Sequence, residues 1–546
     1  MLKYSSFLMV LIFLTVIITS FGKALQPWVP EIVTLEPNNQ TVLSVSQVSK
    51  NAHYAVIQAH TQYKDVTLSL HPNFTMETSE IGSSIGILVV INGQTSLNVY
   101  LTSHLNITVN VLVFISIAAD ASTPVPGGCN LEFNMQNDPN IHIAFRNEIS
   151  NVMFQWAKNS TKDSSCEQSP ALKQLSYQLY VYYIGDSDWT EEAFFNGMKK
   201  MLTHNYVMKH GTKLKEIKYS SSKKPLFKLP SYQGQGTIYN VIVTHGNQIA
   251  SYVPMTTYSC DLNKQDEQCH YATTTSKVLI SVAGVLGLFL CVLGHKYFQT
   301  GNFLMAFCGF CVIFYLVLNI STLQSLTVIF VLSCILATVA GVLWLMLWWC
   351  IGVPVLSVLV PGFTAGYLFA CVLFYTDFGN LLYWTTRYNY GMSFTVGVLI
   401  LPVLILYWTR VLNILCCAFI GSFLITLTID VWIEAGLKFI IVNTFRHAYI
   451  DGYLDVIVTG PFQIKDIILS CVWTVLFVTG SGLQFYRERG KPEFPSCPRK
   501  LRRLHRQHAP NTSDQDHIER DERSPLLRNV AEPYYSTRDR DQSEPT

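Results

Sequence analysis

The stretch LTVIFVLSCILATVAGVLWLML, residues 326–347, has no charged side chain and is long enough to cross a bilayer as one helix. Six further apolar stretches lie in the second half of the chain, at about residues 277–297, 302–319, 351–375, 391–408, 411–432 and 466–486. A membrane-spanning helix needs roughly 20 predominantly apolar residues. The sequence therefore predicts a multi-domain membrane protein with an all-α bundle of seven transmembrane helices at residues 276–486.

The two ends of the chain predict its direction through the membrane. Residues 1–24 combine Lys3, an apolar run too short to span, and small residues at the end, which is typical of a cleaved signal peptide. Eight Lys and Arg residues follow the last span, between residues 487 and 506, and such cations favour the cytosolic side. We therefore expect an extracellular or lumenal N-terminus and a cytosolic C-terminus, which together require an odd number of spans.

The region between the signal peptide and the bundle, called the head below, has a β-rich pattern. Apolar and polar residues alternate at residues 65–70, 174–182 and 236–243, which predicts strands packed as sandwiches with one face buried. A Pro- and Gly-rich stretch at residues 124–128 divides the head into module 1, residues 25–125, and module 2, residues 126–275. One helix is predicted in module 2, with Asp188 as its N-cap and Glu191 completing a capping box.

Four cysteines lie in the head, and an even number in a translocated region predicts two disulfides. They are Cys129, Cys166, Cys260 and Cys269. Three connectivities are possible, and we favour the two pairs that are adjacent in sequence because short loops close at the smallest entropic cost.

The head also contains four N-x-S/T triplets, which are acceptors for N-glycosylation in a translocated region. Their asparagines are Asn39, Asn73, Asn106 and Asn159. Asn319 and Asn511 match the same pattern. We expect neither to be modified, because the first lies at a membrane boundary and the second in the predicted cytosolic tail.

The predicted spans carry little that resembles an active site. The third span ends in WWC, residues 348–350, without the acidic-Arg-aromatic triplet of rhodopsin-type receptors, and the seventh span has no proline. Near the bilayer, the only histidines are His295 and His447, too few for an intramembrane metal hydrolase. No Gly-x-Ser-x-Gly motif occurs in the spans. We therefore expect a non-enzymatic, receptor- or scaffold-like protein without a metal or other cofactor.

Two intramembrane polar residues provide the alternative. Asp430 lies near the outer end of the sixth span, four to five turns from Asn413. Ionisable residues in membranes are costly and often functional. Asp430 either faces the interface beside Glu434, pairs structurally with Lys438 or Lys465, or lines a path or ligand site in the bundle. A path would make the protein a transporter or channel.

Several strings in the chain are distinctive. In the head they are VPGGCNLEFN (125–134), DPNI (138–141), GQGTIYNVIV (234–243) and TYSC (257–260); in the membrane part they are RVLNILCC (410–417), PFQIKDIIL (461–469) and RERGKPEFP (487–495). Together they resemble the transmembrane 7 superfamily member 3 family, from about residue 50 to 495 and again at residues 522–527. The spans also resemble the domain that this family shares with the transmembrane protein 198 group.

The resemblance implies a signal peptide, a glycosylated β-rich head and a seven-span bundle. It also implies a link to cell survival and to the control of endoplasmic reticulum stress. It brings no catalytic or ligand-binding residues that can be placed on this chain.

The remaining predictions concern the tail and the partners. Residues 487–546 are polar and predicted to be a disordered cytosolic tail. Within it, Glu522 precedes Leu526 and Leu527 in the pattern of an acidic dileucine signal, which clathrin adaptors bind. We therefore expect the plasma membrane, endosomes or lysosomes as the destination. The expected partners are the lipid bilayer, a clathrin adaptor, and a protein or carbohydrate ligand of the head, with no nucleic acid.

Overall fold

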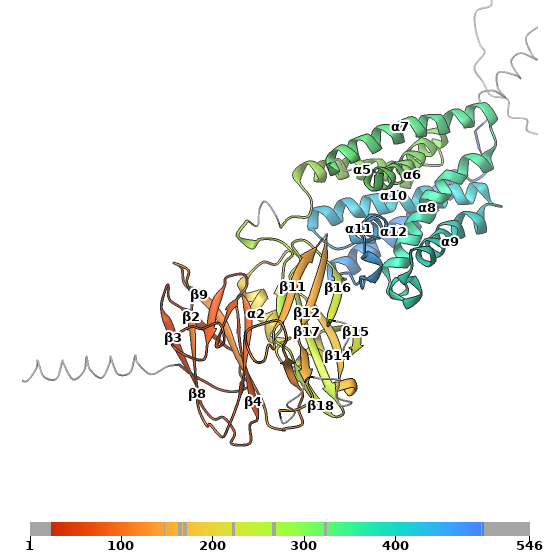
Figure 1. Ribbon diagram of the computed structural model, residues 1–546. Coiled ribbons are helices and arrows are strands. Elements are labelled where there is room, and N and C mark those ends of the chain that lie inside the picture. Colours follow the sequence, from red (N-terminus) through yellow and green to blue (C-terminus); the bar gives the residue numbers. More distant parts are fainter. Residues whose placement is uncertain are drawn as a thin grey trace, which may run out of the picture.

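The computed structural model describes residues 23–146, 148–161, 166, 172–220, 224–264, 269–321, 325–492, 494 and 495. It contains a β-rich head followed by a bundle of long helices (Figure 1). The predicted signal peptide lies almost wholly outside the described residues. So do the sorting residues Glu522, Leu526 and Leu527, and nearly all of the predicted tail.

Module 1 is a sandwich of two sheets. One has the strand order β1-β3-β8-β5-β6 and the other β2-β9-β4-β7. The strands are β1 (Lys23–Leu25), β2 (Glu31–Leu35), β3 (Gln40–Val45), β4 (Tyr54–His60), β5 (Val66–Ser69), β6 (Ser79–Gly82), β7 (Ser84–Val90), β8 (Leu97–Thr102) and β9 (Val109–Ala118). The core between the sheets consists of alternate aliphatic residues, among them Leu43, Ile57, Leu101 and Val111, as the period of two in a strand requires.

Module 2 is also built from sheets that share a core. A three-stranded sheet, β11-β12-β16, faces a five-stranded sheet, β15-β14-β17-β18 with β19 paired to β17, while β10 pairs with β13. The strands are β10 (Val125–Cys129), β11 (Ile141–Arg146), β12 (Ile149–Phe154), β13 (Trp156–Lys158), β14 (Ser176–Tyr183), β15 (Thr212–Lys218), β16 (Leu226–Pro230), β17 (Thr237–His245), β18 (Gln248–Ser251) and β19 (Met255–Thr257). The helices are α2 (Glu191–Lys199), α3 (His204–His210), η1 (Leu172–Gln174) and η2 (Leu262–Lys264).

The predicted single helix in module 2 is wrong in two respects. The N-cap is Thr190, whose side chain accepts a hydrogen bond from the Ala193 amide, while Glu191 instead accepts one from Asn110 of module 1. The helical pattern also breaks into α2 and α3. Thr203 starts a new helix by accepting from the Tyr206 amide, a local bond that competes with continuing the first helix.

Strand β17 corrects a second expectation, because both of its faces are buried rather than one. Tyr239, Val241 and Val243 pack into the core between the sheets of module 2. Ile238 and Ile242 pack on the other face, with the side chains of α2 and α3 and with Leu112 and Phe114 of β9. This second cluster joins the two modules of the head.

Two disulfides fix loops of the head. Cys129 bonds to Cys166 and Cys260 to Cys269, the pairs favoured by loop length. The second joins cysteines nine positions apart, shortly before the first long helix.

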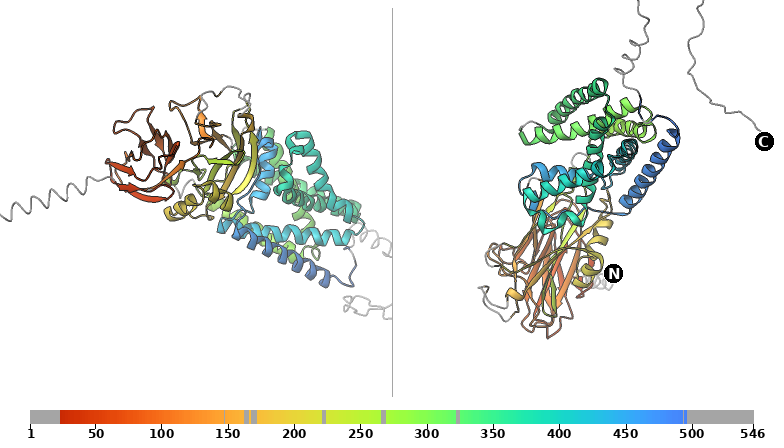
Figure 2. Two further views of the ribbon diagram at one scale, coloured as in Figure 1. Left: turned by 90° about the horizontal axis from the view of Figure 1, so that it is seen from below. Right: turned by 90° about the vertical axis from the view of Figure 1, so that its right-hand side faces the viewer.

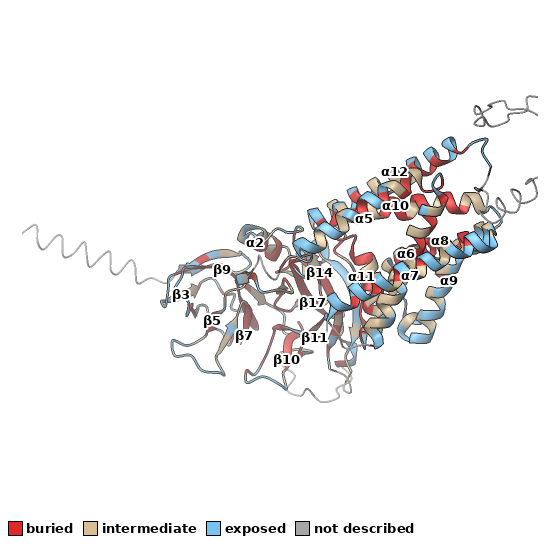
Figure 3. Ribbon diagram, turned by 90° about the horizontal axis from the view of Figure 1, so that it is seen from above, coloured by how far each residue is buried: buried red, intermediate tan, exposed pale blue. Residues whose placement is uncertain are grey.

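Seven helices among the described residues are long and apolar enough to cross a membrane. They are α5 (Thr274–Leu293), α6 (Phe298–Ser321), α7 (Leu326–Ile351), α8 (Pro354–Tyr375), α9 (Arg387–Ile405), α10 (Thr409–Ile433) and α12 (Ile464–Arg487). Each lies within a few residues of a predicted span. Large apolar side chains remain exposed on these helices, as a lipid-facing surface requires. Figure 3 shows exposed positions along the outside of the bundle.

Helix α10 lies at the centre of the bundle, where it packs against α5, α8 and α12. Its contact with α5 is close because Gly421 has no side chain. A Cβ there would lie 2.5 Å from the Cys291 amide nitrogen. A small residue lets two helix backbones approach, which replaces the hydrophobic driving force that is absent in lipid.

Between α10 and α12 the chain forms an element that the sequence did not predict. Helix α11 (Phe439–Tyr449) and the short helix η5 (Tyr453–Asp455) lie beside η3 (Asp377–Asn380) and η4 (Leu382–Thr385), at the end of the bundle that faces the head. Both views in Figure 2 show the head packed against this one end. The head and the bundle therefore meet through α11 and the neighbouring ends of the long helices, on a single side of the predicted membrane.

Candidate functional site

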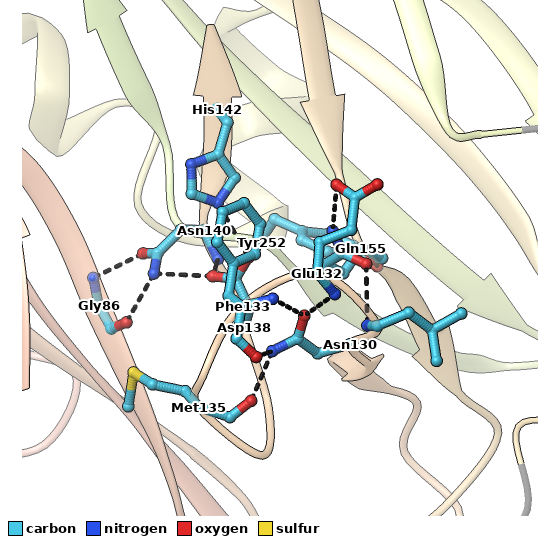
Figure 4. A network of polar contacts seen from close by, with 11 residues as sticks. Gly86, Asn130, Glu132, Phe133, Met135, Asp138, Asn140, His142, Gln155 and Tyr252 are labelled. Atoms are coloured by element: carbon cyan, nitrogen blue, oxygen red, sulfur yellow. Dashed lines mark hydrogen bonds and ion pairs between the residues drawn. The ribbon is translucent and has the colours of Figure 1, made fainter. Parts of the chain in front are cut away.

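The loop from β10 to β11 in module 2 is held by its own side chains (Figure 4). The Asn130 side-chain oxygen accepts hydrogen bonds from the amides of Glu132, at 3.1 Å, and Phe133, at 3.0 Å. Its amide nitrogen donates to the Phe133 carbonyl at 3.0 Å. Asparagine often replaces backbone partners in this way. The loop thus has a defined shape although it belongs to no sheet.

Asp138 and Asn140 connect this loop to module 1. Both side chains are buried. Asp138 accepts from the Asn140 amide and side chain, at 3.1 and 2.9 Å. Asn140 accepts from the Gly86 amide at 2.7 Å and donates to the Gly86 carbonyl at 3.0 Å. Gly86 lies in β7, so this bidentate contact joins the two modules in addition to the apolar cluster around β17.

His142 lies at the edge of the same network. Its Nε2 is 2.9 Å from Asp138 Oδ2, and its ring stacks on Phe133 with centroids 4.4 Å apart. Burial alone would lower the pKa of His142, but the hydrogen bond and negative charge of Asp138 outweigh it and raise the pKa above its usual value. His142 therefore takes up a proton more readily than a free histidine, and its ring is held against Phe133.

A cavity of about 240 Å³ opens beside this loop. Aromatic side chains dominate its lining, with Phe133 and His142 from the loop and β11, Trp156 from β13, and Tyr219 after β15. Most ligand sites combine an apolar lining with a few polar groups. In the sequence this loop stands out only as a distinctive string, because its aromatic partners come from distant parts of the chain.

Asp430, the polar residue proposed from the sequence, lies fully buried at the end of α10. Its two carboxylate oxygens accept hydrogen bonds from the backbone amides of Leu437, at 2.9 Å, and Lys438, at 3.1 Å. Asp430 therefore holds the turn that leads from α10 into α11. This geometry matches a structural role beside Lys438. Asp430 binds the backbone amide of Lys438 rather than its side-chain ammonium group.

Asn413 lies at the opposite end of α10. Its side chain contacts His295 Nδ1 at 2.9 Å, and the His295 amide donates to Gln484 at 3.0 Å. Gln484 also donates to the carbonyls of Leu290 and Cys291. These contacts tie α5, α10 and α12 together. The structure thus places Asn413 and Asp430 in two separate networks.

The junction between the head and α11 is rich in buried polar contacts. Tyr183 and Tyr232 of the head both donate to the Thr459 carbonyl, at 3.0 and 2.9 Å. The Arg446 side chain of α11 is buried and forms an ion pair with Glu148 at 2.7 Å, and it also donates to the Ser231 carbonyl at 3.0 Å. Hydrogen bonds to charged groups are the stronger ones. The ion pair between Arg446 and Glu148 joins positions that are 298 residues apart in the sequence.

A second group of charges lies at the same junction. Glu434 contacts His270 at 2.6 Å, Lys277 at 3.2 Å and Ser187 at 3.0 Å. Asp186 of the head faces this group. Burial, followed by the negative charge of Asp466, raises the pKa of Asp186 to about 6. One of its carboxylate oxygens has no hydrogen-bond partner in the described part of the chain.

The glycosylation acceptors all lie in the head, at Asn39, Asn73, Asn106 and Asn159. The first three are exposed and lie near one another at one end of module 1. Asn38 donates to Asn106 at 2.8 Å, and Gln40 donates to the Pro72 carbonyl at 3.1 Å. Asn159 follows β13 and is half-buried. Asn319 lies within α6.

One Gly-x-Ser-x-Gly sequence occurs outside the spans, at residues 82–86. Ser84 pairs with His60 across β7 and β4, and both side chains are buried. A nucleophile elbow requires a turn between a strand and a helix. Here the serine lies within a β-sheet, so the sequence does not form such an elbow. Over the residues that the structure describes, no group of three or more His, Cys, Asp or Glu side chains could hold a metal ion.

Comparison with known proteins covers all three parts of this arrangement. Family models match residues 23–118 (TM7SF3-like, N-terminal immunoglobulin-like domain), 124–263 (TM7SF3-like, second immunoglobulin-like domain) and 280–485 (TM7S3/TM198-like domain). Transmembrane 7 superfamily member 3 of Homo sapiens is 30% identical over 467 residues, 83% of this chain and 81% of the relative. The Rattus norvegicus protein is 31% identical over 465 residues, 83% of this chain and 82% of the relative. The chain belongs to the transmembrane 7 superfamily member 3 family.

Membership in this family makes the chain a multi-pass membrane protein with immunoglobulin-like domains in its head. Among solved structures, a β-glucuronidase of Parabacteroides merdae aligns with 40% of this chain and 27% of its own, at 8% identity and a TM-score of 0.18. That score is too low to support a conclusion about fold or activity.

Proposed function

We propose that this family member is a non-enzymatic receptor or scaffold, in which the head binds a partner outside the cytosol and passes the event to the helical bundle. The observation that carries the proposal is the junction at α11. Arg446 is buried against Glu148 and Ser231 of the head, and Thr459 accepts from two head tyrosines. A head held in this way cannot reorient without disturbing α11. Such coupling suits a receptor.

The test uses the full-length protein in lipid nanodiscs, presented to an array of secreted and cell-surface ectodomains. We expect at least one partner to bind and to change hydrogen exchange in residues 434–463. Glu148→Ala should bind the same partner with a smaller change there, because Arg446 loses its carboxylate. Glu77→Ala, an exposed acidic position in module 1, is the matched control. Solute flux in liposomes that requires Asp430, without a head partner, would overturn the proposal in favour of a transporter.

The orientation of the termini is part of the same proposal. We expect glycosidase treatment to lower the apparent mass, and joint replacement of Asn39, Asn73, Asn106 and Asn159 by Gln to abolish the shift, because all four lie in the head. The comparison is made by electrophoresis before and after digestion. A glycan at Asn511 would place the tail outside the cytosol and contradict the orientation.

We further propose that the dileucine signal directs the protein to endosomes and lysosomes by way of the plasma membrane. Replacement of Leu526 and Leu527 by Ala should raise the surface level several-fold, since each buried Leu contributes roughly 1.5–3 kcal/mol to adaptor binding. Surface biotinylation measures the change, and unchanged glycan maturation serves as the folding control. An unaltered distribution would mean that the two leucines are incidental.

A role in cell survival and endoplasmic reticulum stress is proposed on the family resemblance. Cells that lack the protein should die sooner under an inhibitor of disulfide formation than cells that regain it. Equal survival of the two would contradict this role.

A further inference from the structure

We propose that the cavity between Phe133 and Trp156 in module 2 binds a neutral carbohydrate. This inference rests on the proposed receptor function, because it names the chemical class of a ligand for the head. It begins from an exposed apolar loop tip. Leu131 is 85% exposed and Phe133 is 42% exposed, although both belong to a loop whose backbone is fixed by Asn130.

The fold holds Leu131 and Phe133 in their exposed positions. The side chains of Asn130, Asp138 and Asn140 hold the loop on its buried side through the hydrogen bonds described above. Rigid presentation of an apolar surface lowers the entropic cost of binding. Leu131 and Phe133 are exposed side by side at the mouth of the cavity, so a ligand in the cavity would contact both.

The lining has the composition that a sugar ring requires. A pyranose presents C–H groups on its faces and hydroxyl groups at its edge. Phe133, Trp156 and Tyr219 supply aromatic faces, whose negative charge density attracts C–H groups. Gln155, Glu132 and His142 supply hydrogen-bond donors and acceptors in the same lining. Gln155 already donates to Glu132, and the His142 ring stacks on Phe133, so these groups are held in place before a ligand arrives.

The charge of the cavity favours a neutral ligand. Glu132 forms an ion pair with Lys224, and His142 pairs with the buried Asp138, so the charges at the cavity cancel. Lys224 also holds the pKa of Glu132 below its usual value, which keeps the pair charged at neutral pH. A cavity of about 240 Å³ has the volume of about eight liquid waters. That space suits one sugar ring and the start of the next, whereas a peptide strand would need a longer groove.

The experiment measures saturation-transfer NMR between the full-length protein in nanodiscs and a panel of free oligosaccharides: oligomannose, N-acetyllactosamine, and sialylated N-acetyllactosamine. We expect transfer to ring protons of a neutral member, and weaker transfer to the sialylated one. Phe133→Ala should weaken binding about tenfold by removing one aromatic face. Phe133→Tyr should retain it. Tyr206→Ala, which removes an exposed aromatic side chain of α3, should leave binding unchanged.

A second variant protects the test against a folding defect. Leu131→Ser alters a side chain that is 85% exposed, so it leaves the core intact and should still weaken binding several-fold. No binding by any member of the panel, or equal binding by the parent and both loop variants, would overturn the carbohydrate assignment. An ectodomain partner that still binds the parent and changes exchange at α11 would then leave the proposed receptor function standing. The two failures are therefore distinguishable.

Discussion

At the scale of single residues, Gly127 allows the start of the candidate loop to pack closely against Asp138. Gly127 has a φ of +63°, and a Cβ at this position would lie 1.6 Å from the Asp138 carbonyl oxygen. Asp138 in turn anchors Asn140, which contacts Gly86 of module 1. A side chain at residue 127 would therefore displace the loop and the contact between modules together.

We predict that Gly127→Ala is much more damaging than Gly93→Ala. Gly93 also has a positive φ, of +76°, but nothing lies within 4 Å of the position of its Cβ. Gly93→Ala should cost only the left-handed strain of about 1–2 kcal/mol. Gly127→Ala should cost more than about 3 kcal/mol, because the backbone must also move. Thermal unfolding of the full chain measures both. Equal losses of stability in the two variants would show that the close contact at residue 127 does not affect the free energy of unfolding.

At the scale of elements, the sequence predicted what depends on length and periodicity. Each of the seven spans was located because no other element needs so many consecutive apolar residues, and β17 because its alternation is regular. Helix α11 was missed because it has eleven residues, too few for a span, and carries polar residues such as Arg446. Its partners Glu148 and Ser231 lie in the head, so no local pattern could reveal it.

The candidate cavity was unpredictable for the same reason. Phe133 and Trp156 come from different strands or loops, and only the fold brings them together. The disulfide pairs could be favoured from the sequence because loop length is a local property. The sequence left several roles open for Asp430. The amides that it binds, those of Leu437 and Lys438, belong to a segment whose structure was not predicted.

We predict that Asp430→Ala destabilises the junction between α10 and α11 by about 2–5 kcal/mol, because two buried amides lose their acceptor. Asp430→Asn should cost less, since its side-chain oxygen can still accept one of the two hydrogen bonds. Thermal unfolding in detergent measures both variants, with Asp451→Ala, at an exposed position, as the control. A variant Asp430→Ala as stable as the parent would refute the structural role.

At the scale of the whole molecule, charged groups from both the head and the bundle lie at the junction between them. Asp186 of the head faces Asp466 and Lys465 of α12, Lys438 before α11, and Asp430 of α10. Glu434 joins the same region through Ser187 and His270. The net charge of these groups depends on pH. We therefore expect the stability of the contact between head and bundle to depend on pH.

Ionisation of Asp186 lowers the stability of the folded protein. Its pKa of about 6 in the folded protein lies above the ordinary value of 3.8, so the folded state binds the proton more tightly than the unfolded state. Ionised Asp186 therefore costs stability above pH 6, and this cost is relieved as the pH falls from about 6 towards 4. We predict that residues 434–466 exchange backbone hydrogens more slowly at pH 5 than at pH 7, after correction for intrinsic exchange.

Asp186→Asn isolates this effect from other titrating groups. His142 also gains stability as the pH falls, because its pKa is raised, whereas Glu434 loses stability, because its pKa is lowered. Both remain in the variant, so the difference between the parent and Asp186→Asn reports on Asp186 alone. At pH 7 the variant should protect the junction more strongly than the parent does, since a neutral amide carries no cost of burying charge. Identical pH profiles for the two proteins would mean that Asp186 is solvated well enough to ionise freely, and that the docking of head on bundle does not respond to its protonation.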